Sequence, residues 1–417
     1  MISMHSSEEK ALAPRIRFAG FTDAWEQRRL GDVAHSFEYG LNAAAMPYDG
    51  KVKYLRITDI DDETREFRQD DVTSPDAPDS QIGPCLLSEG DLLFARTGAS
   101  VGKTYRYQRK DGVTAFAGFL IRAIPNSDVG SSFLYQSTLT EGYKRYIDVA
   151  SQRSGQPGVN AAEYSQWELM VPREPEQRRI GALFSRLDDL IALHQRKCDG
   201  LKTVKKSLLE KMFPRDGETS PEVRFAGFTD AWEQRRLGDV AEIVGGGTPD
   251  TGNPNFWDGE IDWYSPAELG ERVYADGSVR RITEKGFANC SAKMLPAGRT
   301  ILFTSRAGIG NTAILRRSAC TNQGFQSIVI KDGVNVYFLY SMSGSIKRGA
   351  EEKASGSTFL EISGKQLSTI DIAVPQAPEQ RKIGALFSRL DDLIALHQRK
   401  LDALKNVKKS LLEGMFV

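Results

Sequence analysis

The most constraining feature of this chain is an eighteen-residue sequence that occurs twice without a change. RFAGFTDAWEQRRLGDVA occupies residues 17–34 and returns at residues 224–241. A longer block, Glu176 to Phe213, also returns as Glu379 to Phe416 with five differences. The sequences between the repeated blocks diverge almost completely. This arrangement indicates one repeated scaffold that carries two different inserts.

The repeat predicts approximate two-fold symmetry inside one chain. Identical elements tend to pack in equivalent ways, which gives the chain the symmetry that homodimers obtain from two copies. Duplex DNA is a ligand of matching symmetry, because paired half-sites about one helical turn apart present similar faces. A length of 417 residues is sufficient for two domains with ordinary cores.

Charge is balanced overall, with 55 Lys and Arg residues against 55 Asp and Glu residues. The chain therefore lacks the bulk positive field that dominates non-specific nucleic-acid binding, and any DNA-binding charge must be local. The block from Glu176 to Phe213 has nine basic and five acidic residues, a net charge of +4. The alternative explanation for these charges is a solvated helix face.

The cysteines are scattered, without CxxC spacing and without equivalent positions in the two halves; they are Cys85, Cys198, Cys290 and Cys320. This pattern argues against a zinc site or a disulfide framework and favours a reducing cytoplasm. The chain has no 18-residue apolar run, and its start lacks the apolar core of a signal peptide. We expect residues 1–14 to form a short flexible tail.

The longer repeated block predicts a long helix in each half. Residues 176–212 contain no proline, and Pro172, Pro175 and Pro214 are predicted to bracket the helix. At about 1.5 Å per residue such a helix would span roughly 55 Å. Apolar residues and one histidine form a seven-residue stripe at Ile180, Leu187, His194, Leu201 and Leu208, and again at Ile383, Leu390, His397, Leu404 and Leu411. Two helices with the same stripe predict a coiled coil.

Two alternatives apply to these helices. Each could pack only on its own half, but a helix of roughly 55 Å would overhang a domain of about 140 residues, whose diameter is nearer to about 35 Å. His194 and His397 invite a metal-site interpretation, but no acidic or thiol partner stands at ligand spacing. Polar stripe residues that fix the helix register are the favoured interpretation.

Both inserts mix short β-like runs with turn signals, which predicts an α+β domain with a twisted sheet and long loops. The runs are residues 52–57, 91–95 and 117–123 in the first insert and 261–264, 300–304 and 326–330 in the second. Leu87–Thr104 aligns with Leu295–Thr312 if a two-residue gap is allowed near the glycines. Each copy is predicted to contain a turn, a buried strand, an arginine and a glycine-rich loop.

The first glycine-rich loop, Gly98–Thr104, imitates a phosphate-binding P-loop. It has three residues between its glycines where a P-loop requires four, and Asn311 stands in the second copy where Lys103 stands in the first. The loop backbone with Arg96 or Arg306 is instead predicted to approach DNA phosphates or a guanine edge. A plain β-turn with a solvated arginine is the alternative.

Enzyme-like fragments do not form a catalytic pattern. Asn253–Phe256 lacks the second proline of an amino-methyltransferase NPP[YF] motif. Pro249–Asp250 with Glu351–Lys353 imitates a PD…ExK nuclease pattern, but the first half of the chain has no counterpart of this pattern, and such short strings arise by chance. Only four histidines exist and two belong to the helices, so no Ser-His-Asp arrangement is indicated.

Residue types that read DNA bases gather before each helix block, in Gln152–Asn160 and Lys353–Thr358. Arg and Lys bind guanine and Gln and Asn bind adenine, and a good bidentate contact contributes about 1–3 kcal/mol of discrimination. A surface loop is the alternative. The candidate DNA-binding residues are Lys51, Lys53, Arg96, Lys103, Arg153, Ser154, Gln156, Thr248, Arg306, Asn311, Gln323, Lys353, Ser357 and Thr358.

The order of these motifs resembles the specificity subunit of type I restriction-modification systems over nearly the whole chain. The pieces that carry the resemblance are Pro175–Ile180, Pro378–Ile383, Leu208–Phe213, Gly246–Pro249 and Asn322–Phe325. The first insert lacks the GGTP segment of the second and has Glu38–Asn42 nearby instead. Base-reading residues are therefore not transferred from the second insert to the first.

The resemblance implies two target-recognition domains with twisted β-sheets, separated by two long antiparallel coiled-coil helices, in a pseudo-two-fold repeat. It implies that each domain reads one half of a bipartite asymmetric DNA site in the major groove, while the helices set the spacer. The implied boundaries are recognition domains at 15–175 and 222–378, spacer helices at 176–213 and 379–417, and a linker at 214–221.

The resemblance also implies that this chain is not catalytic and binds no cofactor. Two modification subunits would dock on the helices and bring S-adenosylmethionine for adenine methylation, and two restriction subunits would use ATP and Mg for translocation and cleavage. The competing hypothesis is an assembly scaffold whose duplicated helices only bind partner proteins. A stand-alone enzyme would instead methylate or cleave DNA without other chains.

Overall fold

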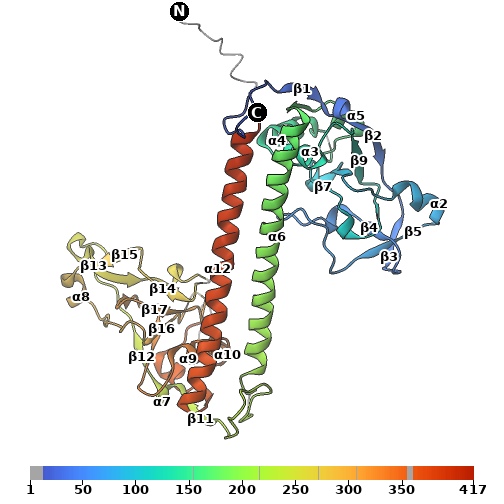
Figure 1. The fold of residues 1–417 in the computed structure, drawn as a ribbon. Coiled ribbons are helices and arrows are strands. Elements are labelled where there is room, and N and C mark those ends of the chain that lie inside the picture. Colours follow the sequence, from blue (N-terminus) through green and yellow to red (C-terminus); the bar gives the residue numbers. More distant parts are fainter. Residues whose placement is uncertain (1–12, 154, 216, 271, 307, 355–359) are drawn as a thin grey trace, which may run out of the picture. The chain divides into compact units, whose positions relative to one another are not determined.

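The computed structural model describes residues 13–153, 155–215, 217–270, 272–306, 308–354 and 360–417 (Figure 1). The candidate residues Ser154, Ser357 and Thr358 and nearly all of the predicted tail at residues 1–14 lie outside these ranges. Contacts divide the chain into two compact units. Unit 1 contains the residues up to Arg196 together with Gln398–Val417, and unit 2 contains Lys197–His397.

Two long helices are present, as the sequence predicts: α6 (Glu174–Lys211) and α12 (Ala377–Met415). Each begins two residues before its predicted start and ends two residues before its predicted end. Pro175 and Pro378 lie inside the first turn rather than outside the helix, because a proline in that turn sacrifices no intrahelical hydrogen bond. Each helix gives its first half to one unit and its second half to the other.

Unit 1 combines short sheets with small helices (Figure 1). Its four-stranded sheet has the order β2 (Ala34–Tyr39), β9 (Leu120–Pro125), β6 (Leu92–Ala95) and β7 (Thr104–Arg106). Three strand pairs accompany it: β1 (Glu26–Arg29) with β10 (Glu168–Val171), β3 (Ala44–Pro47) with β5 (Thr73–Asp76), and β4 (Lys53–Leu55) with β8 (Thr114–Phe116). The helices besides α6 are α1 (Leu30–Val33), α2 (Asp79–Ile82), α3 (Ser131–Ser137), α4 (Glu141–Ala150) and α5 (Ala161–Ser165).

Unit 2 repeats the frame around a different insert. Its main sheet has the order β12 (Ala241–Gly245), β19 (Gln326–Ile330), β16 (Thr300–Phe303), β17 (Thr312–Leu315) and β14 (Tyr274–Ala275). A second sheet joins β15 (Arg280–Ile282), β13 (Trp257–Tyr264) and β18 (Cys320–Thr321), and β11 (Glu233–Arg236) pairs with β20 (Asp371–Val374). The short helices are α7 (Leu237–Val240), α8 (Glu284–Ala288), α9 (Val336–Ser341), α10 (Ser343–Lys353) and α11 (Gly364–Ser368). The predicted α+β class is confirmed.

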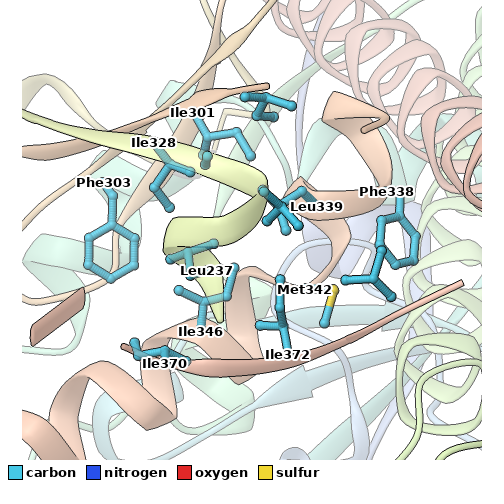
Figure 2. Close-up of a cluster of buried hydrophobic side chains, with 14 of the residues drawn as sticks. Leu237, Ile301, Phe303, Ile328, Phe338, Leu339, Met342, Ile346, Ile370 and Ile372 are labelled. Carbon is cyan, nitrogen blue, oxygen red and sulfur yellow. The ribbon is translucent and has the colours of Figure 1, made fainter. Parts of the chain in front are cut away.

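The core of unit 2 joins the main sheet to the short helices. Ile301 of β16 and Ile328 of β19 are register partners, and both side chains are buried on the face that meets the helices (Figure 2). Leu237 of α7, Leu339 of α9 and Ile346 of α10 belong to the same buried cluster. This cluster also includes residues of α12, so the sheet is held against the long helix by continuous apolar packing.

The repeated segments make the same junction in both units. Arg17 donates to the two carboxylate oxygens of Glu176 at 2.7 and 2.8 Å, and Arg224 does the same to Glu379 at 2.7 and 2.8 Å. Both glutamates are 1% exposed. The hydrogen bond to Glu176 raises the pKa of Arg17 above its ordinary value. The identical eighteen-residue segments therefore clamp the first turn of each long helix.

In both units the predicted helix stripe lies where halves of the two long helices meet. Ile180 and Leu187 are buried in the core of unit 1, and Leu404 and Leu411 pack against that core. The equivalent residues of unit 2 are Ile383 and Leu390, with Leu201 and Leu208 against the core. The alternative that each helix packs only on its own half is therefore wrong.

Aromatic residues at the ends of the long helices complete the two cores. The ring of Phe416 lies 6.2 Å from Trp25, 5.4 Å from Phe133 and 5.8 Å from Phe184 in unit 1. In unit 2, Phe213 contacts the equivalent set, Trp232, Phe338 and Phe387, at 6.0, 5.8 and 5.9 Å. The helix block that follows the first insert thus ends in the core of unit 2. The helix block that follows the second insert ends in the core of unit 1.

A truncation in the stripe is expected to be costly. Leu187 and Leu390 are each 9% exposed, so replacing either with alanine should lower the free energy of unfolding by about 2–5 kcal/mol through lost burial and a residual cavity. Chemical denaturation of the variants measures the effect. Leu193→Ala is the matched control, since Leu193 lies on the same helix and is 38% exposed. A loss of less than about 0.5 kcal/mol for Leu187→Ala would contradict a packed stripe.

None of the helices in the described ranges combines the length and the apolar character needed to cross a bilayer.

Candidate nucleic-acid interface

The loop that follows β6 and the polar segment Gln152–Asn160 lie side by side in unit 1. The backbone N–H of Val159 donates to the carbonyl of Arg96 at 2.9 Å, and that of Gly98 donates to Pro157 at 3.0 Å. Gly98 has a φ of +75°, which favours glycine. A side chain there would also meet Gln156, whose Nε2 lies 3.1 Å from the position of an added Cβ. The structure therefore brings together two predicted candidates, Arg96 and Gln156.

Arg96 is held between two exposed aromatic rings that the sequence analysis did not single out. Its guanidinium carbon lies 5.1 Å from the ring centre of Tyr39 and 5.8 Å from that of Phe119. Its Nε donates to the carbonyl of Gly118 at 3.0 Å. Tyr39 is 47% exposed and Phe119 is 58% exposed. We call these three side chains, Tyr39, Arg96 and Phe119, the aromatic clamp.

Phe119 was missed because residues 117–123 suggested a strand that begins earlier than it does. Strand β9 starts at Leu120, so Phe119 lies in the turn before it and points to solvent. Gly118, which precedes it, was the available signal, since glycine often marks a turn. Tyr39 ends β2, and its hydroxyl accepts a hydrogen bond from the backbone N–H of Ala161 at 3.3 Å.

Lys103 is placed in the interior rather than at a surface. It is 7% exposed, and its Nζ lies 2.7 Å from a carboxylate oxygen of Asp62 and donates to the carbonyl of Ile60. The hydrogen bond from Lys103 holds the pKa of Asp62 below its ordinary value. The ammonium is therefore used for internal structure, which counts against Lys103 as a DNA contact.

The other basic candidates of unit 1 also have internal partners. Lys53 donates from Nζ to the carbonyl of Asp111 at 2.7 Å, besides a contact with Gln69. Arg153 donates to the carbonyls of Ala150 and Gln152 at 3.0 and 2.8 Å and pairs with Glu163. Lys51 is exposed in the turn before β4, where its backbone N–H donates to Asp49 at 2.8 Å. Of these, Lys51 and Arg153 are exposed and Lys53 is half-buried.

The two glycine-rich loops are not equivalent at their arginines. The N–H of Arg96 donates to Phe119, and the N–H of Ser305 donates in the same way to Gly324 at 2.8 Å. The carbonyl of Ser305 accepts from Ile362 at 3.1 Å, as that of Arg96 does from Val159. Ser305, and not Arg306, therefore occupies the position of Arg96. Each loop has an arginine after its buried strand, as predicted, but the two arginines are displaced from each other by one position.

The candidates of unit 2 gather around the GGTP and NQGF segments. Thr248 donates from its hydroxyl to the Oε1 of Gln323 at 2.5 Å. Trp263 donates to the carbonyl of Gly247 at 2.8 Å and anchors this loop. A Cβ on Gly246 would lie 2.1 Å from the carbonyl oxygen of Asn322, so only glycine allows the two segments to approach this closely.

The remaining candidates of unit 2 lie on surface loops. Arg306 is half-buried after β16, and Asn311 is exposed, with its backbone N–H donating to the hydroxyl of Thr304 at 2.9 Å. Lys353 is exposed at the end of α10, and its carbonyl accepts from Gln366 at 2.8 Å. No group of three or more His, Cys, Asp and Glu side chains is arranged to hold a metal ion within the described parts of the chain.

The two units share one frame and carry different polar surfaces, which is the architecture of a two-domain specificity protein. Comparison with known proteins agrees with this architecture. Residues 22–203 and 229–406 match the family described as type I restriction modification DNA specificity domain. These two stretches cover more than half of the chain. The chain belongs to this family, and the predicted resemblance is confirmed.

Individual relatives carry the same description. A stretch of 190 residues is 36% identical to the type I restriction enzyme MjaIX specificity subunit of Methanocaldococcus jannaschii, and covers 45% of this chain and 44% of that one. The putative type I restriction enzyme MjaX specificity subunit of the same organism is 23% identical over 400 residues, 93% of this chain and 92% of that one. The crystal structure of a type-I restriction-modification S subunit from M. genitalium shares the fold, with a TM-score of 0.66, 14% identity and coverage of 97% and 99% of the two chains.

Proposed function

We propose that this chain is the sequence-specific DNA-recognition subunit of a type I restriction-modification enzyme. Each unit would read one half of a bipartite asymmetric site in the major groove. The observation that carries the proposal is the contrast between equivalent positions. Unit 1 has Arg96 in the aromatic clamp where unit 2 has the fully buried Ser305, and unit 2 exposes the Thr248–Gln323 pair instead. Unlike side chains on a shared frame suit two different half-site sequences.

We further propose that the long helices act as an antiparallel coiled-coil spacer between the half-sites. Support comes from equivalent ion pairs that join the two helices within each unit. Lys408 of α12 lies 2.6 Å from Asp188 of α6, and Lys205 of α6 lies 2.6 Å from Asp391 of α12. All four charges belong to the repeated blocks, which explains why those blocks are nearly identical while the inserts differ.

The chemistry in this proposal comes from other chains. Two modification subunits would dock on the duplicated helices and use S-adenosylmethionine, and two restriction subunits would use ATP and Mg. This chain would bind no cofactor, would not be catalytic and would work in the cytoplasm. The duplicated frame supports two copies of one partner, because identical partners require equivalent surfaces.

Selection from a random DNA pool tests the proposal. The chain, assembled with its modification subunits, is expected to enrich one bipartite asymmetric sequence with a fixed spacer. The alternative of a scaffold that only binds partner proteins predicts no enriched sequence. Incubation of this chain alone with duplex DNA and S-adenosylmethionine, or with ATP and Mg, is expected to give neither methylation nor cleavage.

Exchange of one insert is expected to change one half-site only. Replacing residues 35–170 with the corresponding insert of a relative should alter the half-site read by unit 1 and leave the other half-site and the spacer unchanged, because the frame and the second insert are intact. Methylome mapping of cells that carry the hybrid system measures both halves together. Altered reading of both halves would contradict independent readers.

A further inference from the structure

We propose that Arg96 reads a guanine in the half-site of unit 1, and that Tyr39 and Phe119 hold its guanidinium ready for this contact. The inference deepens the proposed function and rests on it. It decides between alternatives that the sequence left open, since the glycine-rich loop predicted Arg96 or Arg306 at either a phosphate or a guanine edge.

The side-chain hydrogen bond of Arg96 leaves the terminal nitrogens of its guanidinium available for a base. Its Nε donates to Gly118, so the two terminal nitrogens, Nη1 and Nη2, form the outward fork. A fork of two parallel N–H groups matches the O6 and N7 acceptors on the major-groove edge of guanine. The flanking rings restrict the rotamers of Arg96 before DNA binds, which reduces the entropy lost on contact.

The partners of Arg96 distinguish it from the arginines that stabilise this unit. Arg122 lies near Glu38 and Asp91, and Arg153 pairs with Glu163. Within the described ranges no carboxylate lies within ion-pair distance of Arg96. Its charge is instead compensated by two ring faces that are themselves largely exposed, an arrangement that is typical of binding surfaces rather than of a folded interior.

The backbone around the aromatic clamp is built to hold it. A Cβ on Gly40 would lie 2.3 Å from the carbonyl oxygen of Ala117, so glycine is required for the end of β2 to reach the turn that carries Phe119. The hydroxyl of Tyr39 is fixed by the N–H of Ala161. Gln156 lies beside the same loop, with its Nε2 3.1 Å from the position of an added Cβ on Gly98.

A phosphate contact is the competing role for the half-buried Arg96, and the comparison of units favours a base. Phosphates are the same in both half-sites, so a positioning contact should recur at equivalent places of a duplicated frame. The equivalent position in unit 2 is Ser305, which is uncharged and fully buried. A residue that contacts a base is expected to differ between the two units, because the two half-sites differ in sequence. The difference between Arg96 and Ser305 fits this expectation.

The test compares selected DNA sequences for the wild-type complex and for variants with the modification subunits bound. Arg96→Ala should lower discrimination for guanine at one position of one half-site by about 5- to 150-fold. Phe119→Ala should weaken the same preference in part, because the fork loses one supporting ring. Tyr39→Phe, which keeps the ring, should retain the preference. The half-site of unit 2 reports in each case that the complex is assembled.

Base substitution in the selected duplex gives a second measurement that needs no variant to fold. Replacing that guanine with 7-deazaguanine removes the N7 acceptor and should reduce the affinity of the wild type by about 2- to 10-fold. The same replacement should have little further effect on Arg96→Ala. Arg96→Lys, which retains the charge but not the rigid fork, should keep only part of the guanine preference.

Three outcomes separate the possibilities. Uniform weakening across all sequences with a shallower salt dependence would identify Arg96 as a phosphate contact and overturn the inference. An unchanged preference at every position would also overturn it while leaving the proposed function intact. Absence of any enriched sequence with the wild-type complex would instead contradict the proposed function itself.

Discussion

A fragment that ends after Phe213 is expected to form a homodimer. Unit 1 requires the second half of α12, and α6 carries a nearly identical sequence that the fragment could offer to a second copy. In the repeat, Lys205 of α6 is equivalent to Lys408, which pairs with Asp188. Phe213 is equivalent to Phe416, which packs in the aromatic core of unit 1. Light scattering coupled to size-exclusion chromatography of residues 13–217 would measure the mass.

One of the five differences between the blocks supplies the control for this fragment. Ile16 donates from its backbone to the carbonyl of Gly414 at 2.8 Å, and a Cβ on Gly414 would lie 2.6 Å from the Cδ1 of Ile16. Lys211 is the residue at the equivalent position of α6. Lys211→Gly should therefore tighten the dimer by removing this crowding. A monomeric, folded fragment would show that the second helix half is dispensable for unit 1.

Truncation of the terminal aromatic residues is expected to act across the chain rather than locally. Phe213→Ala should destabilise unit 2 by about 3–5 kcal/mol, because Phe213 is 8% exposed among three other aromatic rings. Phe416→Ala should destabilise unit 1 by a smaller amount, because Phe416 is only partly buried there. Hydrogen exchange of peptides around Trp25 and Trp232 would report the two units separately.

The two variants control each other, since the same substitution is made in equivalent surroundings. Phe416→Ala should accelerate exchange around Trp25 and leave Trp232 unchanged, and Phe213→Ala should do the reverse. Val407→Ala, at a side chain that is 48% exposed on α12, should change neither. Faster exchange around Trp232 in Phe416→Ala, or around Trp25 in Phe213→Ala, would contradict the assignment of each helix end to the unit of the other insert.

The periodic part of the fold and the pairing of the two helices could be predicted from the sequence, but not which insert each helix end completes. Ile180 and Leu187 were correctly placed on an apolar stripe, because a seven-residue spacing fixes one face of a helix. The same stripe occurs on both helices and predicts their pairing, but it does not indicate which insert the end of each helix packs on. Tertiary contacts such as that of Phe416 in unit 1 decide between the two arrangements.

The candidate site was predictable by residue type and not by position. Arg96 and Gln156 were selected because such side chains read bases, and their closeness comes from backbone pairing between segments distant in sequence. Lys103 was selected for its place after a glycine-rich loop, but the buried contact with Asp62 depends on a turn that no local motif connects to it. Tyr39 and Phe119 were missed for the same reason, since only folding brings them to Arg96.

The division of the long helices has a consequence for biosynthesis. Unit 2 is one continuous segment, Lys197–His397, whereas unit 1 is assembled from residues at both sides of it. The aromatic core around Trp25 and Phe133 therefore stays incomplete on the ribosome until Phe416 has been synthesised, although its first residues emerge early. The N-terminal insert should thus be the later of the two to mature and the more dependent on chaperones during translation.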